Sequence, residues 1–122
     1  MDRIEEFTQD GKKIVYIDFS HFTTTEELSS FIESAKPYIK KYPLNSIYTI
    51  TNMEGMTVNS ETHDIMAGWV EHNKPYVKFG AVYGVDGIKR ILAKTIAVLT
   101  KRNNLVYVSS RGEALNSLLQ QD

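Results

Sequence analysis

Histidine is the residue type in this sequence with the widest chemistry, because it binds metal ions and exchanges protons near neutral pH. The chain has three: His21, His63 and His72. His63 and His72 stand nine residues apart in one predicted helix, which directs them to roughly opposite faces. No carboxylate or second histidine stands beside them at metal-ligand spacing. We therefore expect exposed or capping histidines and no metal site.

Ser60, His63 and Asp64 supply the three side-chain types of a hydrolase triad. No Gly-x-Ser-x-Gly sequence surrounds Ser60, so nothing predicts the sharp turn that exposes a nucleophilic serine. No other pair of titratable groups is placed by the sequence to act together. We expect Ser60, or Asn59 before it, to cap a helix, and we predict that the protein is not an enzyme.

The stretch 76–87 reads as a buried strand that passes through a glycine-rich corner into a long helix. Its glycines suggest nucleotide binding, but a dinucleotide fingerprint needs glycine where position 82 is valine, and no Gly-Lys-Ser/Thr sequence follows. No cofactor is predicted. Gly84 is expected to supply an unusual backbone angle. Asp86 is a good N-cap, and its carboxylate would compete with any anion for the N–H groups at the helix start.

Basic side chains cluster on the helix beyond this corner: Lys89, Arg90, Lys94, Lys101 and Arg102. Two interpretations stay open, a solvated helix face and a surface for an acidic partner. The net charge of the whole chain is -1, so no global field points to nucleic acid or to an anionic membrane. We predict no nucleic-acid partner and no membrane insertion.

Length and composition indicate one domain that covers residues 1–122, with 42% hydrophobic residues for one core. The absence of cysteine excludes disulfides and thiolate chemistry, and it fits a reducing cytoplasm, where we expect the protein to reside. The N-terminus has no apolar run typical of a signal peptide. No stretch approaches the length of a transmembrane helix.

Apolar runs typical of strands alternate with helical periods along the chain. Asp10-Gly11 is a type I′ hairpin signal, which predicts an antiparallel pair at one edge of the sheet. The remaining alternation predicts an α/β fold with a mostly parallel sheet. The predicted strands cover 3–8, 12–18, 46–51, 77–82 and 105–108.

Capping signals precede the helices, as in Thr24 with Glu27 and Ser110 with Glu113. Pro37 predicts a kink or a break in the first helix, near Ala35. Trp69 is predicted to be buried on the second helix. The third helix has the clearest apolar stripe in the chain, through Ile88, Ile91, Leu92, Thr95, Ile96 and Leu99. The segment 105–108 is expected to be the last buried strand.

Three stretches resemble the SpoIIAA-like family of small bacterial proteins, which is related to STAS anti-sigma-factor antagonist domains and, more distantly, to CRAL-TRIO lipid-binding domains. Residues 14–20 resemble the family's first buried strand. Residues 72–78, followed by 81–87, carry the most specific likeness. Residues 113–115 resemble the family's closing helix. The resemblance implies a four-unit β/α superhelix.

The resemblance is weaker for function. STAS antagonists carry Asp-Ser-Ser/Thr-Gly at the start of the second helix, and a partner kinase phosphorylates its serine. The corresponding residues here, 57–61, lack the Asp and the Gly and offer only Ser60. The resemblance therefore implies a non-catalytic interaction or regulatory module without this phosphorylation motif. Its partner would be a protein or a second copy of the chain. The alternative is a domain that binds a small apolar or lipid-like ligand.

Ligands of open parallel sheets gather outside the carboxyl ends of the strands. There we expect two loops to converge, with Met56 and Val85 as adaptable apolar contact surface. The alternative functional surface is the basic helix face with Lys89, Arg90 and Lys94. The predicted ligand- or partner-binding residues are Met56, Asn59, Ser60, Gly84, Val85 and Asp86.

Overall fold

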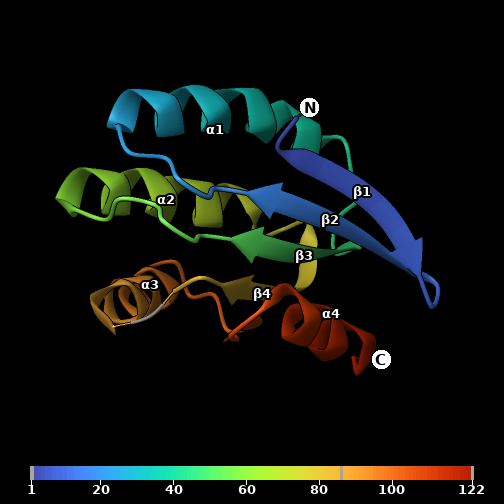
Figure 1. Cartoon of the computed structure of the whole chain (residues 1–122). Coiled ribbons are helices and arrows are strands. Elements are labelled where there is room, and N and C mark those ends of the chain that lie inside the picture. The colour runs from blue at the N-terminus through green and yellow to red at the C-terminus, as the bar shows by residue number, and fades with distance from the viewer. Residues whose placement is uncertain (1, 86, 122) are drawn as a thin grey trace.

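One sheet in chain order, β1-β2-β3-β4-β5, organises the part of the chain that the structure describes (Figure 1). The structure, a computed structural model, describes residues 2–85 and 87–121 apart from the side chains of Ile88 and Leu92. The strands are β1 (Ile4–Gln9), β2 (Lys12–Asp18), β3 (Ile47–Asn52), β4 (Val77–Tyr83) and β5 (Leu105–Tyr107). The helices are α1 (Thr25–Lys40), α2 (Ser60–Asn73), α3 (Gly87–Leu99) and α4 (Arg111–Leu119).

Strand direction follows from the connections. β1 and β2 pair antiparallel across the turn at Asp10 and Gly11, whose φ angles of 52° and 77° are those of a type I′ hairpin. The other neighbours, β2 with β3, β3 with β4 and β4 with β5, pair parallel because a helix separates each pair in the chain. The predicted α/β fold, mostly parallel with an antiparallel N-terminal edge hairpin, is confirmed.

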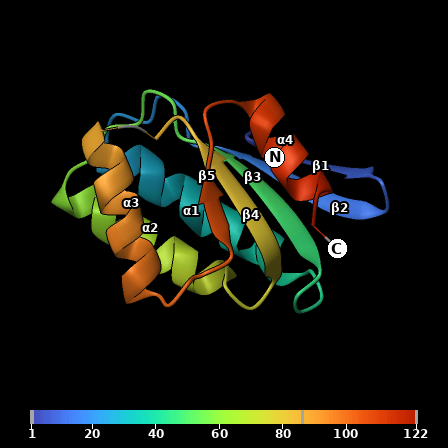
Figure 2. The same cartoon turned by 90° about the horizontal axis from the view of Figure 1, so that it is seen from below.

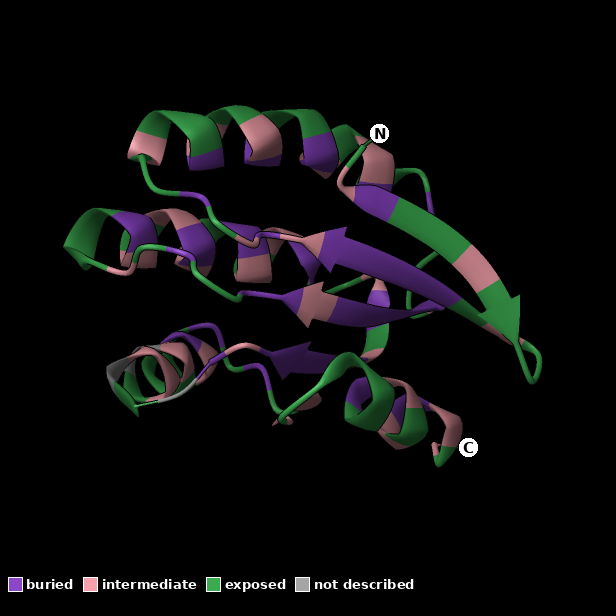
Figure 3. Cartoon of the chain, in the orientation of Figure 1, coloured by how far each residue is buried: buried purple, intermediate pink, exposed green. Residues whose placement is uncertain are grey.

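Helices cover both faces of the sheet, unequally. Three helices, α1 to α3, lie on one face and α4 alone lies on the other (Figure 2). Because side chains alternate along each strand, Val15 and Ile17 enter the larger core while Ile14 and Tyr16 enter the smaller one. The buried residues therefore concentrate on the inner helix faces and the central strands (Figure 3).

Trp69 of α2 is buried in the larger core, with 3% of its surface exposed, as predicted. Its ring meets Phe19 edge-on, with centroids 5.8 Å apart, and it stacks with His72. An aromatic contact of this kind ties α2 to the segment that follows β2.

Side-chain caps begin three of the helices. Thr24 and Ser110 accept hydrogen bonds from the backbone N–H of Glu27 and Glu113, as their spacing predicted. For α2 the sequence left Asn59 and Ser60 open, and Asn59 is the cap. Its side chain accepts from the Thr62 N–H at 3.0 Å, and the Thr62 hydroxyl accepts from the Asn59 N–H at 2.8 Å.

α1 continues through Pro37 to Lys40, so a break near Ala35 is wrong. Proline removes one helical hydrogen bond. Buried side chains on both sides of it, including Ile32 and Ile39, hold the helix against the sheet. Most helix stability in proteins comes from such packing rather than from local preference.

One expectation about burial is also wrong. The last strand, β5, is half-buried along its whole length because it forms one edge of the described sheet. Of the predicted α3 stripe residues whose side chains are described, only Ile96 is buried, whereas Ile91, Thr95 and Leu99 are exposed.

Candidate binding site at the carboxyl ends of the strands

The loops after β3 and β4 lie side by side at the carboxyl edge of the sheet. The Met53 N–H donates to the Tyr83 carbonyl at 2.9 Å. Gly84 has a φ of +81°, and a Cβ placed there would lie 2.4 Å from the Glu54 backbone nitrogen. Only glycine satisfies both conditions. The unusual backbone angle predicted for Gly84 is present, and it lets the two loops touch.

The loop after β2 joins the same edge. The His21 N–H donates to the Glu54 carbonyl at 2.9 Å, and the Phe19 N–H donates to the Asn52 carbonyl at 2.8 Å. A Cβ on Gly55 would lie 2.3 Å from the His21 ring. Three loops therefore continue the sheet beyond its strands as one connected rim.

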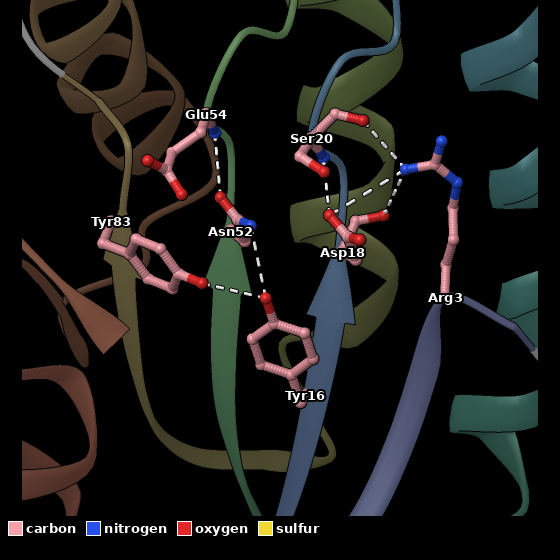
Figure 4. A network of polar contacts seen from close by, with 7 residues as sticks. All are labelled: Arg3, Tyr16, Asp18, Ser20, Asn52, Glu54 and Tyr83. Carbon is pink, nitrogen blue, oxygen red and sulfur yellow. Dashed lines mark hydrogen bonds and ion pairs between the residues drawn. The ribbon is translucent and has the colours of Figure 1, made fainter. Parts of the chain in front are cut away.

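A buried polar network lies beneath this rim on the α4 side (Figure 4). The hydroxyls of Tyr16 and Tyr83 are 2.8 Å apart, and the Asn52 side-chain amide donates to Tyr16 at 3.2 Å. The Asn52 side-chain oxygen accepts from the Glu54 N–H at 2.9 Å. Burial, followed by the bond to Tyr16, raises the pKa of Tyr83, so the Tyr83 hydroxyl stays protonated at physiological pH.

A second network closes the rim at β1 (Figure 4). Arg3 donates to the carbonyls of Asp18 and Ser20, at 3.2 and 2.9 Å, and its guanidinium lies 3.9 Å from the centroid of Phe22. The Asp18 carboxylate accepts from the Ser20 N–H at 2.8 Å. These contacts occupy the polar groups at the end of β2, which leaves the ends of β3, β4 and β5 as the open part of the edge.

A polar cleft of about 460 Å³ opens at those three strand ends. Four chain segments form its walls: the β3–α2 loop, the β4–α3 loop, the first turn of α3 and the segment after β5. The lining residues are Glu54, Gly55, Gly84, Val85, Lys89, Arg90, Val108 and Ser109.

A separate apolar cavity of about 80 Å³ lies between α2, α3 and the sheet. Its lining includes Met53, Met56, Met66 and Trp69. It is smaller than the roughly 300–1,000 Å³ of typical small-molecule pockets.

Arg102 lines this cavity and is buried, so it does not belong to a solvated basic face with Lys94 and Lys101. It donates to the Asn104 side chain at 2.7 Å and to the Val70 carbonyl at 3.2 Å, near the end of α2. Burial lowers its pKa from the ordinary value for arginine. These two hydrogen bonds connect α2 to the turn before β5, which indicates a structural role for Arg102.

The structure brings together only part of the predicted site. Gly84 and Val85 line the polar cleft. Met56 lines the apolar cavity instead. Met56 and Val85 are 2% and 3% exposed, so the expectation that they offer surface for contact is wrong. Their apolar side chains complete the larger core.

The other predicted site residues stand apart from both hollows. Asn59 and Ser60 are exposed at the start of α2 and line neither the cleft nor the cavity. Asp86 lies outside the described residues.

Sequence reasoning missed the remaining walls of the cleft, Glu54, Gly55, Val108 and Ser109. The available signal was their place in the chain, because each follows the carboxyl end of a parallel strand. Lys89 and Arg90 belonged to the alternative prediction, a basic helix face, and the structure places both in the lining of the cleft. Both are partly buried, whereas Lys94 is exposed.

Ser60, His63 and Asp64 do not form the hydrogen-bonded arrangement of a hydrolase triad. His63 Nδ1 lies 3.6 Å from Asp64, and no hydrogen bond among described residues links His63 to Ser60. Residues 2–85 and 87–121 contain no group of three or more His, Asp or Glu side chains that could hold a metal ion. Within the same residues, no helix combines the length and apolarity needed to cross a lipid bilayer.

A solved structure of an anti-sigma-factor antagonist (STAS) domain protein from Planctomyces limnophilus resembles this chain, with a TM-score of 0.59. The similarity covers 96% of this chain and 98% of that one, at 14% sequence identity. The chain has the STAS fold. The predicted SpoIIAA-like, STAS-type architecture is therefore confirmed. No family model and no curated protein matches the sequence, so the STAS assignment describes the fold.

Proposed function

We propose that the protein is a non-catalytic STAS-like module that binds a protein partner through the outward face of α3. The observation that carries this proposal is the exposure of three large apolar side chains on that helix. Ile91 is 65% exposed, Val98 is 77% exposed and Leu99 is 66% exposed. Exposed apolar groups that cluster on one element are typical of interaction surfaces.

Helical spacing makes these residues one surface. Ile91 and Val98 are seven residues apart, with Thr95 between them, and Leu99 adjoins Val98. Exposed Lys94 lies beside the stripe. The partner that fits is a helix or groove with an apolar centre and acidic groups at its border. The similarity to an anti-sigma-factor antagonist (STAS) domain protein supports a regulatory role of this kind.

Regulation in this proposal does not run through Ser60. The Asp and Gly that flank the acceptor serine in antagonist domains are missing from residues 57–61. Ser60 is the first residue of α2, and its neighbour Asn59 already caps the helix. The cytoplasm is the compartment that we propose for this activity, because the chain has no cysteine.

Affinity capture from a lysate of the native host tests the surface. We expect one protein to be retained by the wild type and by Ser60→Ala but lost with Val98→Glu. Leu44→Glu is the matched control, because Leu44 is 70% exposed in the loop between α1 and β3. With the purified partner, Val98→Glu should weaken binding about tenfold or more, or 1.4 kcal/mol. The proposal is wrong if Val98→Glu and Leu44→Glu reduce the retained amount of every captured protein to the same extent.

Native mass spectrometry of the purified protein separates two further outcomes. A dimer that Val98→Glu dissociates would identify the partner as a second copy of the chain. A retained small molecule would favour the alternative function, a site for an apolar ligand. The observation behind that alternative is the cavity lined by Met53, Met56 and Met66. Its volume of about 80 Å³ argues for a ligand of only a few heavy atoms.

A further inference from the structure

We propose that the polar cleft at the ends of β3, β4 and β5 binds a small water-soluble molecule through a phosphate or carboxylate group. This inference goes beyond the proposed function and does not depend on it. The cleft opens at the strand ends, whereas the proposed partner surface is the outward face of α3.

The size and position of the cleft fit a small ligand. Its volume of about 460 Å³ falls within the roughly 300–1,000 Å³ of small-molecule sites. It lies at the carboxyl edge of a parallel sheet, where such sites gather in open α/β folds. Backbone contacts hold the loops that line it in place. Gly84 packs against the backbone of Glu54, and the Val108 N–H donates to the Val82 carbonyl at 2.9 Å.

The cations of the cleft have no acidic partner among the described residues. Lys89 and Arg90 both line it, and neither forms an ion pair there. The Arg90 Nε atom is buried and has no hydrogen-bond partner among residues 2–85 and 87–121. A buried donor on a charged group is costly when unsatisfied. Oxyanions match the planar guanidinium by accepting two parallel hydrogen bonds.

The acidic side of the cleft narrows the ligand class. Glu54 lines the cleft, and Glu113 lies next to it, where its carboxylate accepts from the Ser109 N–H at 2.6 Å. A ligand with anionic groups at both ends would be repelled by Glu54. The cleft therefore suits a molecule with an oxyanion near Arg90 and a hydroxyl or amino donor for Glu54.

Backbone amide chemical shifts in a titration with inorganic phosphate test this site. Sodium chloride is adjusted so that the ionic strength stays constant through the titration. Screening of surface charges, which acts over about 8 Å at physiological salt, is then the same at every phosphate concentration. Saturable shifts are expected at Gly55, Gly84, Val85 and Ser109. Acetate, which has a single carboxylate, is the second probe and separates a carboxylate from a phosphate preference. Glycerol 3-phosphate should bind more tightly than inorganic phosphate because it adds hydroxyl donors.

Variants on one helix provide the controls. Arg90→Gln should weaken phosphate binding about tenfold or more, and Lys89→Gln should also weaken it. Lys94→Gln removes the same charge from an exposed position of α3 and should leave the affinity within about twofold. Glu54→Gln should tighten binding about threefold, the effect expected for two unit charges ~7 Å apart in water. Asp86 is unchanged in every variant.

Four results would overturn the proposal. They are shifts that never saturate, shifts spread along α3 toward Lys94, equal weakening by Arg90→Gln and Lys94→Gln, and weaker binding after Glu54→Gln. Thermal unfolding of each variant identifies a folding defect, and Lys89→Gln keeps the test valid if Arg90→Gln is unstable. Val98→Glu should leave phosphate binding unchanged, so failure here and failure of the proposed function are distinguishable.

Discussion

α2 and α3 cover the same face of the sheet, yet they use their apolar residues in opposite ways. α2 has the less regular apolar pattern, but it buries Met66 and Trp69. α3 has the clearest pattern in the sequence, but it exposes Ile91, Val98 and Leu99. An apolar stripe in the sequence shows that a helix has an apolar face. It does not show that its own domain covers that stripe.

The position of each helix explains the difference. α2 lies between α1 and α3 and contacts both (Figure 1). α3 lies toward the edge at β5, which is only a short, half-buried strand. Among the α3 side chains that the structure describes, Ile96 is buried in the larger core and Ala93 packs against it. Ile91, Val98 and Leu99 of the same helix stay exposed.

The largest expected effect is at Trp69 of α2. Trp69→Ala should cost about 3–5 kcal/mol, because it removes a buried ring beside an existing cavity. Urea unfolding followed by circular dichroism measures the loss. Val98→Ala on α3 is the control and should change stability by less than about 0.5 kcal/mol. A loss of unfolding free energy below about 1 kcal/mol for Trp69→Ala would mean that α2, like α3, leaves its large apolar side chain exposed.

The second effect concerns the corner that leads into α3. Gly84→Ala should cost about 2–4 kcal/mol, because it combines a positive φ with a collision between Cβ and the Glu54 backbone. Gly87→Ala isolates the first contribution. Gly87 has a φ of +49° with open space around it, so its substitution should cost about 1–2 kcal/mol. If thermal unfolding shows equal losses of stability for Gly84→Ala and Gly87→Ala, the β3–α2 loop moves to accommodate the new Cβ at no measurable free-energy cost.

The smallest effect concerns the start of α2. Asn59→Ala should cost about 1 kcal/mol, because it leaves the Thr62 N–H without its side-chain acceptor. Ser60→Ala should stay within about 0.5 kcal/mol, since Ser60 follows the cap. Guanidinium unfolding of both variants compares them. A larger loss for Ser60→Ala would reverse the assignment of the cap.

Much of the fold was predictable because its signals are local. Asp10 and Gly11 specify a hairpin by their backbone preferences, and Thr24 and Ser110 specify helix starts by their spacing to Glu27 and Glu113. Pro37 misled because its local cost is real but is outweighed by packing on both sides. The candidate site was predictable only in part, since its position follows from parallel strands while its walls come from four separate segments.

The sequence by itself determined the order of strands and helices, the hairpin, the parallel sheet and the need for glycine at position 84. These features depend on backbone preferences and on the alternation of apolar residues, which neighbours in the chain express. The tertiary structure alone decided which apolar residues are covered and which charges meet. Met56 and Val85 became core, Ile91 and Val98 stayed outside, and Lys89 and Arg90 came to line one cleft with Glu54 and Ser109. Burial and the grouping of charged side chains depend on distances between remote segments, and those distances exist only once the sheet has assembled.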